Sequence, residues 1–204
     1  MITDDEAVAV AVDHESFWPS QLPTVDADDA EQLLAAALRG FRSLAVRGAI
    51  TPDGDLGPEL ALAESVVGST PRFSLFLSHS QDVGTSLLPL SAHIDPGEGR
   101  DWVLDRISPL GVHVLSSHPR QEHLDYLEYA CRDVLESGVP EFGIGDDGDA
   151  VGPPPDMLCV AAAEGDLLLL WGLGKGRCIR WDAAGGPEKA RPAELSELLA
   201  FLGP

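Results

Sequence analysis

The clearest pattern in the chain is a run of hydrophobic residues at helical spacing near its N-terminal end. Between Leu33 and Ala45 the apolar positions recur in steps of three and four, which places them on one face of a helix. Asp28 and Asp29 precede the run and supply an N-cap and an acidic first turn, and Gly48 follows it and suits the position after the last turn. A helix is therefore expected between these acids and Gly48, and a second one over residues 57–67.

The middle and the end of the chain change to the pattern of strands. Alternating apolar and polar residues, or short apolar runs bounded by turns, predict strands at residues 7–12, 72–78, 85–94, 102–107, 112–116, 157–163, 166–173 and 177–182. Pro89 makes the third of these an edge strand or a bulged one, because proline lacks the N–H that a ladder needs. Glycine turns at 164–166 and 174–176 join the last three strands into an antiparallel meander.

Two further helices and one loop complete the prediction. Helices are expected over residues 119–135 and 192–202, each with proline at its first position. Residues 139–156 are rich in glycine, proline and acids, and we expect an exposed, mobile loop there. Helices flank grouped strands without regular β-α-β alternation. The predicted fold class is therefore α+β: a single domain over residues 1–204, with a mostly antiparallel central sheet and flanking helices.

The charge of the chain argues against two classes of partner. The sequence has 34 acidic and 13 basic residues and a formal net charge of −21. The acids are concentrated in residues 1–150, whereas residues 151–204 are nearly neutral. Phosphate backbones and anionic membrane surfaces would repel such a chain, so we expect neither a nucleic acid nor a membrane as a partner. The charge serves solubility or attracts a basic protein.

The cysteines and the N-terminal residues indicate a cytoplasmic protein. Cys131 and Cys159 fall in apolar patterns that are typical of small core residues, and Cys178 makes the count odd. An odd count at wide spacing disfavours a disulfide framework. The first residues lack the basic and apolar regions of a signal peptide, and the longest apolar stretch is too short to cross a bilayer.

Candidate chemistry is weak throughout the chain. His93 and Asp95 are two residues apart, which would place two metal-type ligands on one face of a strand, but no metal-binding motif accompanies them. Ser78 and His79 are neighbours and would point to opposite faces of a strand. The glycines of residues 172–176 lack the spacing of a phosphate loop. We therefore expect no catalytic residue, no metal and no cofactor, and hence a protein that is not an enzyme.

One segment, residues 41–60, resembles a known family. Its residues describe the end of a helix, a turn and the start of a new helix, and the ones that carry the resemblance are Leu44, Arg47, Gly48, Asp53, Gly54, Pro58, Glu59 and Leu60. Their order resembles the EspG family of actinobacterial type VII (ESX) secretion chaperones. The resemblance extends over about residues 28–80 and is faint over 157–204. The chain would be a short and divergent member.

The resemblance implies a cytoplasmic chaperone without enzymatic activity, with a central sheet and helices on one side of it. Its partner would be a secreted helical substrate or heterodimer, which it would hold soluble before type VII export. By analogy with the family, the loop after Phe76, the helix at 119–136 and the last helix would contact this partner, with Leu127, Leu198 and Phe201 as candidate contact residues. The alternative that the charge leaves open is an acidic, immunity- or antitoxin-like module that neutralises a basic protein.

Overall fold

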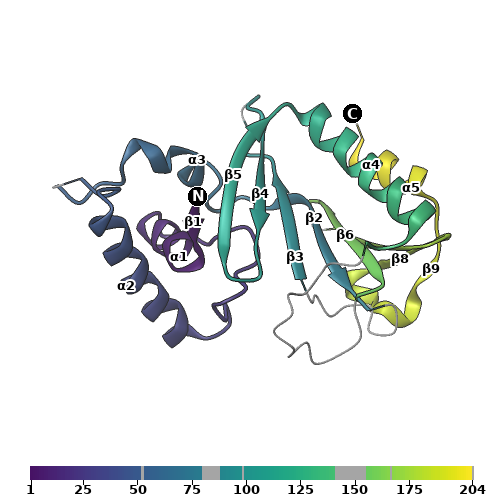
Figure 1. Ribbon diagram of the computed structural model, residues 1–204, viewed down its shortest axis with the longest axis horizontal. Coiled ribbons are helices and arrows are strands. Elements are labelled where there is room, and N and C mark those ends of the chain that lie inside the picture. The colour runs from purple at the N-terminus through teal and green to yellow at the C-terminus, as the bar shows by residue number, and fades with distance from the viewer. Residues whose placement is uncertain (52, 80–87, 98, 141–154, 166, 204) are drawn as a thin grey trace. The chain divides into compact units, whose positions relative to one another are not determined.

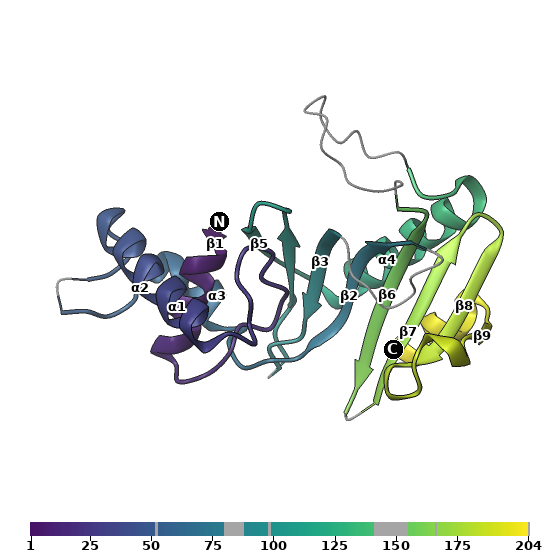
Figure 2. The same ribbon diagram turned by 90° about the horizontal axis from the view of Figure 1, so that it is seen from below.

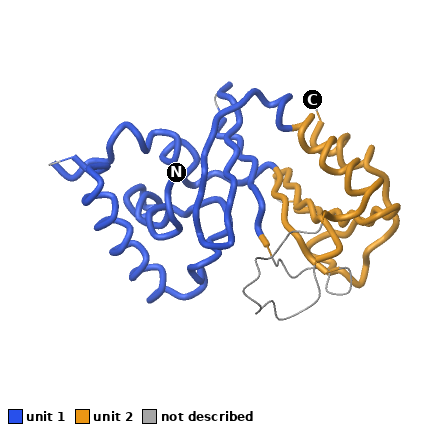
Figure 3. Tube along the Cα trace, viewed as in Figure 1, with its two compact units in different colours: residues 1–72, 89–123 blue, residues 73–88, 124–204 orange. Residues whose placement is uncertain are grey.

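The chain of the computed structural model groups into two compact units, which are described here one at a time. The structure describes all residues except 52, 80–87, 98, 141–154, 166 and 204. Unit 1 comprises residues 1–72 and 89–123, and unit 2 comprises residues 73–88 and 124–204 (Figure 3). Helices and antiparallel strands are both abundant, so the α+β class is confirmed. The single domain stays a prediction, and most of the loop expected at 139–156 lies outside the described residues.

The strands of unit 1 are antiparallel and lie in the order β1-β5-β4-β3 (Figure 1). Their bounds are Ile2–Thr3 for β1, Leu88–Ile94 for β3, Trp102–Ile107 for β4 and Val112–His118 for β5. The alternating patterns predicted the last three strands, and residues 85–87 of the longer prediction lie outside the described residues. The pairing of β3 with β4 begins at Ser91, beyond Pro89.

The strand predicted at residues 7–12 is wrong, because these residues belong to a helix, α1 (Asp4–Asp13). A capping box starts this helix: the Glu6 amide donates to Thr3 Oγ1 at 3.3 Å, and the Thr3 amide donates to Glu6 Oε2 at 3.1 Å. The alanines and valines that follow are buried almost all round. A helix buried on all sides shows no polar face, so its apolar run looked like that of a strand.

The long helix predicted after Asp29 is confirmed as α2 (Ala30–Val46), although its buried face differs from the expected one. Asp29 Oδ1 accepts a hydrogen bond from the Glu31 amide at 2.9 Å, and Gly48 follows the helix with a φ of +75°. The buried stripe comprises Ala36, Ala37, Gly40 and Leu44. Leu34 and Leu38, which the periodicity placed on the core face, are 63% and 56% exposed. Small residues face inward because α1 packs closely against α2 at Gly40.

A single predicted helix at residues 57–67 is replaced by two short pieces. They are the 3-10 helix η1 (Pro58–Leu60) and the helix α3 (Ala61–Glu64). Both contribute to the apolar core of unit 1, which draws residues from the helices and the strands alike, among them Ala9, Leu44, Leu60, Ala63, Ile94 and Val103.

Unit 2 contains five antiparallel strands in the order β2-β6-β7-β8-β9 (Figures 1 and 2). Their bounds are Pro71–Ser78 for β2, which belongs to this unit from Phe73 onward, Met157–Glu164 for β6, Leu167–Gly174 for β7, Arg177–Asp182 for β8 and Arg191–Pro192 for β9. The predicted meander is therefore confirmed. Two 3-10 helices, η2 (Ala183–Gly185) and η3 (Pro187–Lys189), connect β8 to β9.

Two helices complete unit 2: α4 (Arg120–Ser137), from its residue 124 onward, and α5 (Leu195–Leu202). Pro192 does not begin the last helix as predicted. It lies in β9, and a capping box at Glu194 starts α5. The backbone of α4 is tied to the β7–β8 turn, because the Gly176 amide donates to the Leu135 carbonyl at 2.8 Å. Among the described residues, no helix is both long and apolar enough to cross a membrane.

Candidate functional site

A buried charge network joins three elements of unit 1. Asp4 starts α1, Asp105 lies on β4 and His113 lies on β5. His113 Nε2 is 2.7 Å from Asp4 Oδ1, and His113 Nδ1 is 2.8 Å from Asp105 Oδ2. Asp4 Oδ2 also accepts two hydrogen bonds from Thr24, from its amide at 2.6 Å and from its hydroxyl at 2.7 Å. The three buried side chains, those of Asp4, Asp105 and His113, thereby all have polar partners, whereas Thr24 is exposed.

The network holds His113 as a cation. Burial lowers its pKa, but the hydrogen bonds and charges of Asp105 and Asp4 outweigh burial and raise the pKa to about 9. The pKa of Asp4 is lowered: burial acts to raise it, but the hydrogen bonds of His113 and Thr24 together outweigh burial. An Asp-His-Asp set resembles a proton-relay arrangement, but both ring nitrogens are engaged and the imidazole is 0% exposed. A general base needs a free nitrogen within reach of substrate, so this network acts as a structural tie.

A second buried network in unit 1 is a pair of histidines that carries no charge. His93 Nδ1 and His123 Nδ1 are 2.6 Å apart, and both side chains are buried. His123 Nε2 lies 3.2 Å from the Trp102 carbonyl, which can only accept, so this nitrogen carries the hydrogen. The Nδ1 of His123 must then accept from His93 Nδ1. His93 Nε2 is left to accept from the Ser91 hydroxyl at 3.3 Å.

Protonation of both rings would place two Nδ1–H donors face to face. Burial and the neighbouring His123 lower the pKa of His93 to about 3, and burial above all lowers that of His123. His93 and Asp95, which were considered as a metal pair and set aside, have separate partners: Asp95 lies beyond the end of β3 and accepts from the Gly97 amide. No cluster of three or more metal-type ligands occurs among the described residues.

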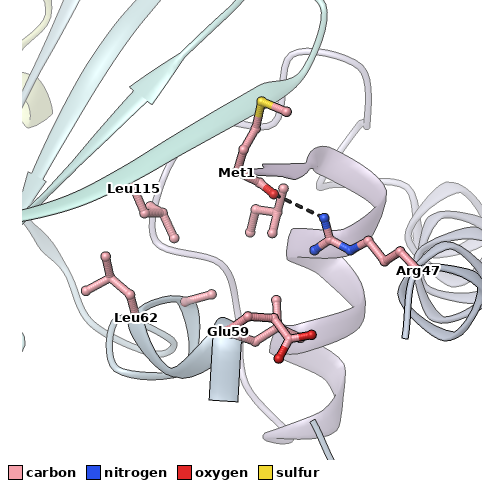
Figure 4. A pocket seen from close by; sticks show the side chains of 8 residues that line it. Met1, Arg47, Glu59, Leu62 and Leu115 are labelled. Carbon is pink, nitrogen blue, oxygen red and sulfur yellow. Dashed lines mark hydrogen bonds between the residues drawn. The ribbon is translucent and has the colours of Figure 1, made fainter. Parts of the chain in front are cut away.

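The segment that carries the family resemblance builds one wall of a pocket in unit 1. The pocket has a volume of about 340 Å³, and its lining includes Met1, Arg47, Glu59, Leu60, Leu62 and Leu115 (Figure 4). Gly48 ends α2 and Gly54 has a φ of +96°, so the chain turns back and begins η1 at Pro58. The predicted order of helix end, turn and helix start is confirmed. Leu44 and Leu60 anchor the segment in the core.

Arg47 connects the lining of the pocket to the N-terminal residues. Its Nη1 donates to the Met1 carbonyl at 3.2 Å (Figure 4), and its Nε is 3.5 Å from Glu6 Oε1. The Ser43 hydroxyl also donates to Glu6 Oε1, at 2.7 Å. Glu59 lies on the exposed side of the pocket. The lining of the pocket therefore combines apolar side chains with one cation, which is already partnered, and one carboxylate at its margin.

The outer face of α4 in unit 2 exposes two aromatic side chains. Tyr126 is 53% exposed and Tyr129 is 72% exposed. Asp133 and Glu136 continue the same stripe at helical spacing and are exposed as well. Tyrosines are enriched in protein interfaces, because a rigid ring contributes a large contact area and the hydroxyl tolerates water. We define these four residues as the α4 outer face. Their sequence spacing could have identified it, had the polar side of this helix been searched for aromatics.

The residues predicted to contact a partner lie mainly beneath the surface. Leu127 and Leu198 are both 0% exposed, so a partner cannot reach either side chain in this conformation. Phe201 is partly buried, and its ring centroid is 5.5 Å from that of Trp171. Neighbouring residues of a helix are rotated by about a quarter of a turn. Leu127 can therefore point inward although Tyr126, the residue before it, is exposed. The helix was a reasonable candidate, but its accessible side chains are the tyrosines.

Comparison with known protein families found no family model that matches the sequence, and no curated protein matches it either. The functional interpretation therefore depends on the geometry described above and on the resemblance carried by residues 41–60.

Proposed function

We propose that this protein is a cytoplasmic, protein-binding chaperone of EspG type that keeps a secreted helical substrate soluble before type VII export. The observation that carries the proposal is the α4 outer face, with Tyr126 and Tyr129 exposed side by side on a helix. The resemblance over residues 41–60 supplies the class of partner. The sealed histidine networks support a binding role over a catalytic one, since neither presents a free ring nitrogen.

The α4 outer face suits a helical partner. A stripe of side chains at steps of three and four can lie along a second helix, as in helix-in-groove recognition. The helix beneath it is held firmly, because Leu127 and Cys131 are buried without exposed surface. A rigid backbone reduces the entropy that binding must overcome.

Co-expression tests this proposal directly. The protein is produced together with a secreted helical protein pair encoded beside its gene, and the soluble fraction of that pair is measured. The wild-type protein should raise this fraction. The double variant Tyr126→Ala/Tyr129→Ala should weaken the complex roughly tenfold or more, as expected for interface aromatics. Val46→Ala is the matched control, because Val46 is 89% exposed on another helix. A pair whose solubility the protein leaves unchanged contradicts the proposal.

A second candidate function is an acidic module that neutralises a basic protein. It is favoured by the net charge of −21 and by the carboxylates of Asp133 and Glu136 beside the tyrosines. Charge-steered complexes weaken with salt, whereas apolar contacts do not. The dissociation constant of the captured complex is therefore measured between low and high salt. A steep rise with salt supports neutralisation, and a constant value supports the chaperone.

A further inference from the structure

One edge of β5 extends beyond the strand that covers it. On its outer side β5 pairs with β1, and only through Val112 and His113. On its inner side β5 pairs with β4 from His113 to His118. Among the described residues, no strand therefore pairs with the outer side of β5 after His113.

The backbone groups along this open edge can be assigned from the pairing. In an antiparallel ladder, successive residues direct their N–H and C=O to opposite sides. The Val112 carbonyl accepts from the Ser108 amide at 2.9 Å on the β4 side, and the Gly111 carbonyl accepts from the Asp4 amide at 2.8 Å on the outer side. The alternation then directs the amides and carbonyls of Leu115 and Ser117 outward.

The open edge borders the pocket of unit 1. Leu115 contributes to the pocket lining, and its side chain points towards Leu62 of α3 (Figure 4). Met1 and Ile2, at the end of β1, line the same pocket. The space that follows β1 along β5 is therefore a pocket with an apolar wall and two pairs of outward backbone groups.

We propose that this edge is a strand-addition site, which binds an extended segment of a partner protein antiparallel to β5 and in line with β1. The segment would pair with Leu115 and Ser117. Residues opposite one another in a ladder share a face of the sheet, so the residue opposite Leu115 places its side chain in the pocket. Backbone hydrogen bonds supply the affinity in this mode of recognition, and the pocket supplies the specificity.

The charge and the pocket define the chemistry of this segment. An apolar side chain fits between Leu62 and Leu115, with a polar residue on either side of it in sequence. Glu59 at the margin and the net charge of −21 disfavour acidic segments. The ligand is therefore an extended, alternating segment of neutral or basic charge. The site uses no residue of the α4 outer face, so its test is independent of the test of the proposed function.

Hydrogen exchange in the free protein tests whether the edge is open. The amides of Leu115 and Ser117 should exchange much faster than those of Val114 and Ser116, which bond to β4. Equal protection of the four amides would overturn the proposal. Analytical ultracentrifugation of the wild type and of Ser117→Pro accompanies this measurement. If the wild type is a dimer and the variant is a monomer, the edge binds a second copy of this chain, and the proposal of a partner segment is overturned.

Selection from a displayed library of random nine-residue peptides tests the ligand. Binders should alternate in polarity, carry few acids and protect the Leu115 and Ser117 amides. Ser117→Pro removes an outward N–H without touching the β4 ladder, and edge strands tolerate such a proline. It should weaken the selected peptides at least tenfold. Ser117→Ala, which keeps the N–H, should bind as the wild type does. Peptides that bind Ser117→Pro equally well, or a library without alternating binders, would refute the site.

Discussion

Two buried histidine networks in unit 1 hold their rings in opposite protonation states. His113 lies between two carboxylates and is a cation with its pKa raised to about 9, whereas His93 faces another imidazole and is neutral with its pKa lowered to about 3. Both rings are 0% exposed, so burial alone does not explain the difference. The groups that each ring contacts decide its charge. A buried histidine therefore cannot be assigned a charge, or a role, from burial without its partners.

Removing the cation from the charged network should have the largest effect. His113→Gln leaves the carboxylates of Asp4 and Asp105 buried, with at most one neutral donor between them. Breaking a buried ion pair by loss of one partner typically costs about 3–5 kcal/mol. Urea denaturation should show a loss of this size in the free energy of unfolding. His14→Gln, at a partly exposed pair with Glu64, is the control and should change it by less than about 1 kcal/mol. Equal losses of unfolding free energy in the two variants would contradict the structural role of the His113 network.

The pH dependence of stability should have a maximum near pH 6.5, the ordinary pKa of histidine. His113 has a raised pKa, so its contribution is complete below pH 6.5 and is lost as the pH rises through about 9. This loss amounts to about 3 kcal/mol. His93 has a lowered pKa, so its contribution is complete above pH 6.5 and is lost as the pH falls towards 3. Asp4, whose pKa is also lowered, adds to the loss on the acid side.

Urea denaturation between pH 4 and 9.5 measures this profile. His113→Gln should abolish most of the decline on the alkaline side, and His93→Leu should reduce the decline on the acid side. An alkaline decline that persists in His113→Gln would show that another group causes it.

Replacing a ring of the neutral pair should cost less than replacing His113. In His93→Leu the Nδ1 of His123 loses its donor and the buried Ser91 hydroxyl loses its acceptor, which leaves two buried neutral groups unpaired. An unpaired neutral group costs about 1–3 kcal/mol. The measured loss at pH 7 should therefore be smaller than that of His113→Gln. A larger loss would mean that the pair carries charge, against the tautomers assigned above.

The hydroxyl at the end of each network offers the finest comparison. Thr24→Val removes a hydrogen bond to the charged Asp4, and Ser91→Ala removes one to the neutral His93. Hydrogen bonds to charged groups contribute about 1.5–3 kcal/mol, and those between neutral groups about 0.5–1.5 kcal/mol. Thermal unfolding at pH 6.5 should thus show the larger decrease in Tm for Thr24→Val. The reverse order would contradict the assigned charges.

Local patterns predicted most elements of the fold, because their causes are local. The helix after Asp29 is set by its cap, its periodicity and Gly48, and the meander of β6, β7 and β8 is set by alternation and glycine turns. The prediction of a strand at residues 7–12 was wrong because an apolar run does not distinguish a strand from a helix buried on all sides. The signal that would have corrected the prediction was available in the sequence: Thr3 and Glu6 have the spacing of a capping box.

The sequence by itself determined the α+β class, the two long helices, most of the strands, the acidity and the turn segment that ends in Leu60. Only the tertiary structure decided which polar residues meet. Asp4 and His113 are 109 positions apart, and His93 and His123 are 30 apart. It also decided which face of a helix is buried: Leu34 and Leu38 lie outside because the small residues of α2 face α1, and Leu127 lies inside while Tyr126 and Tyr129 do not. Spacing fixes which side chains share a face, but the neighbour that covers this face comes from elsewhere in the chain.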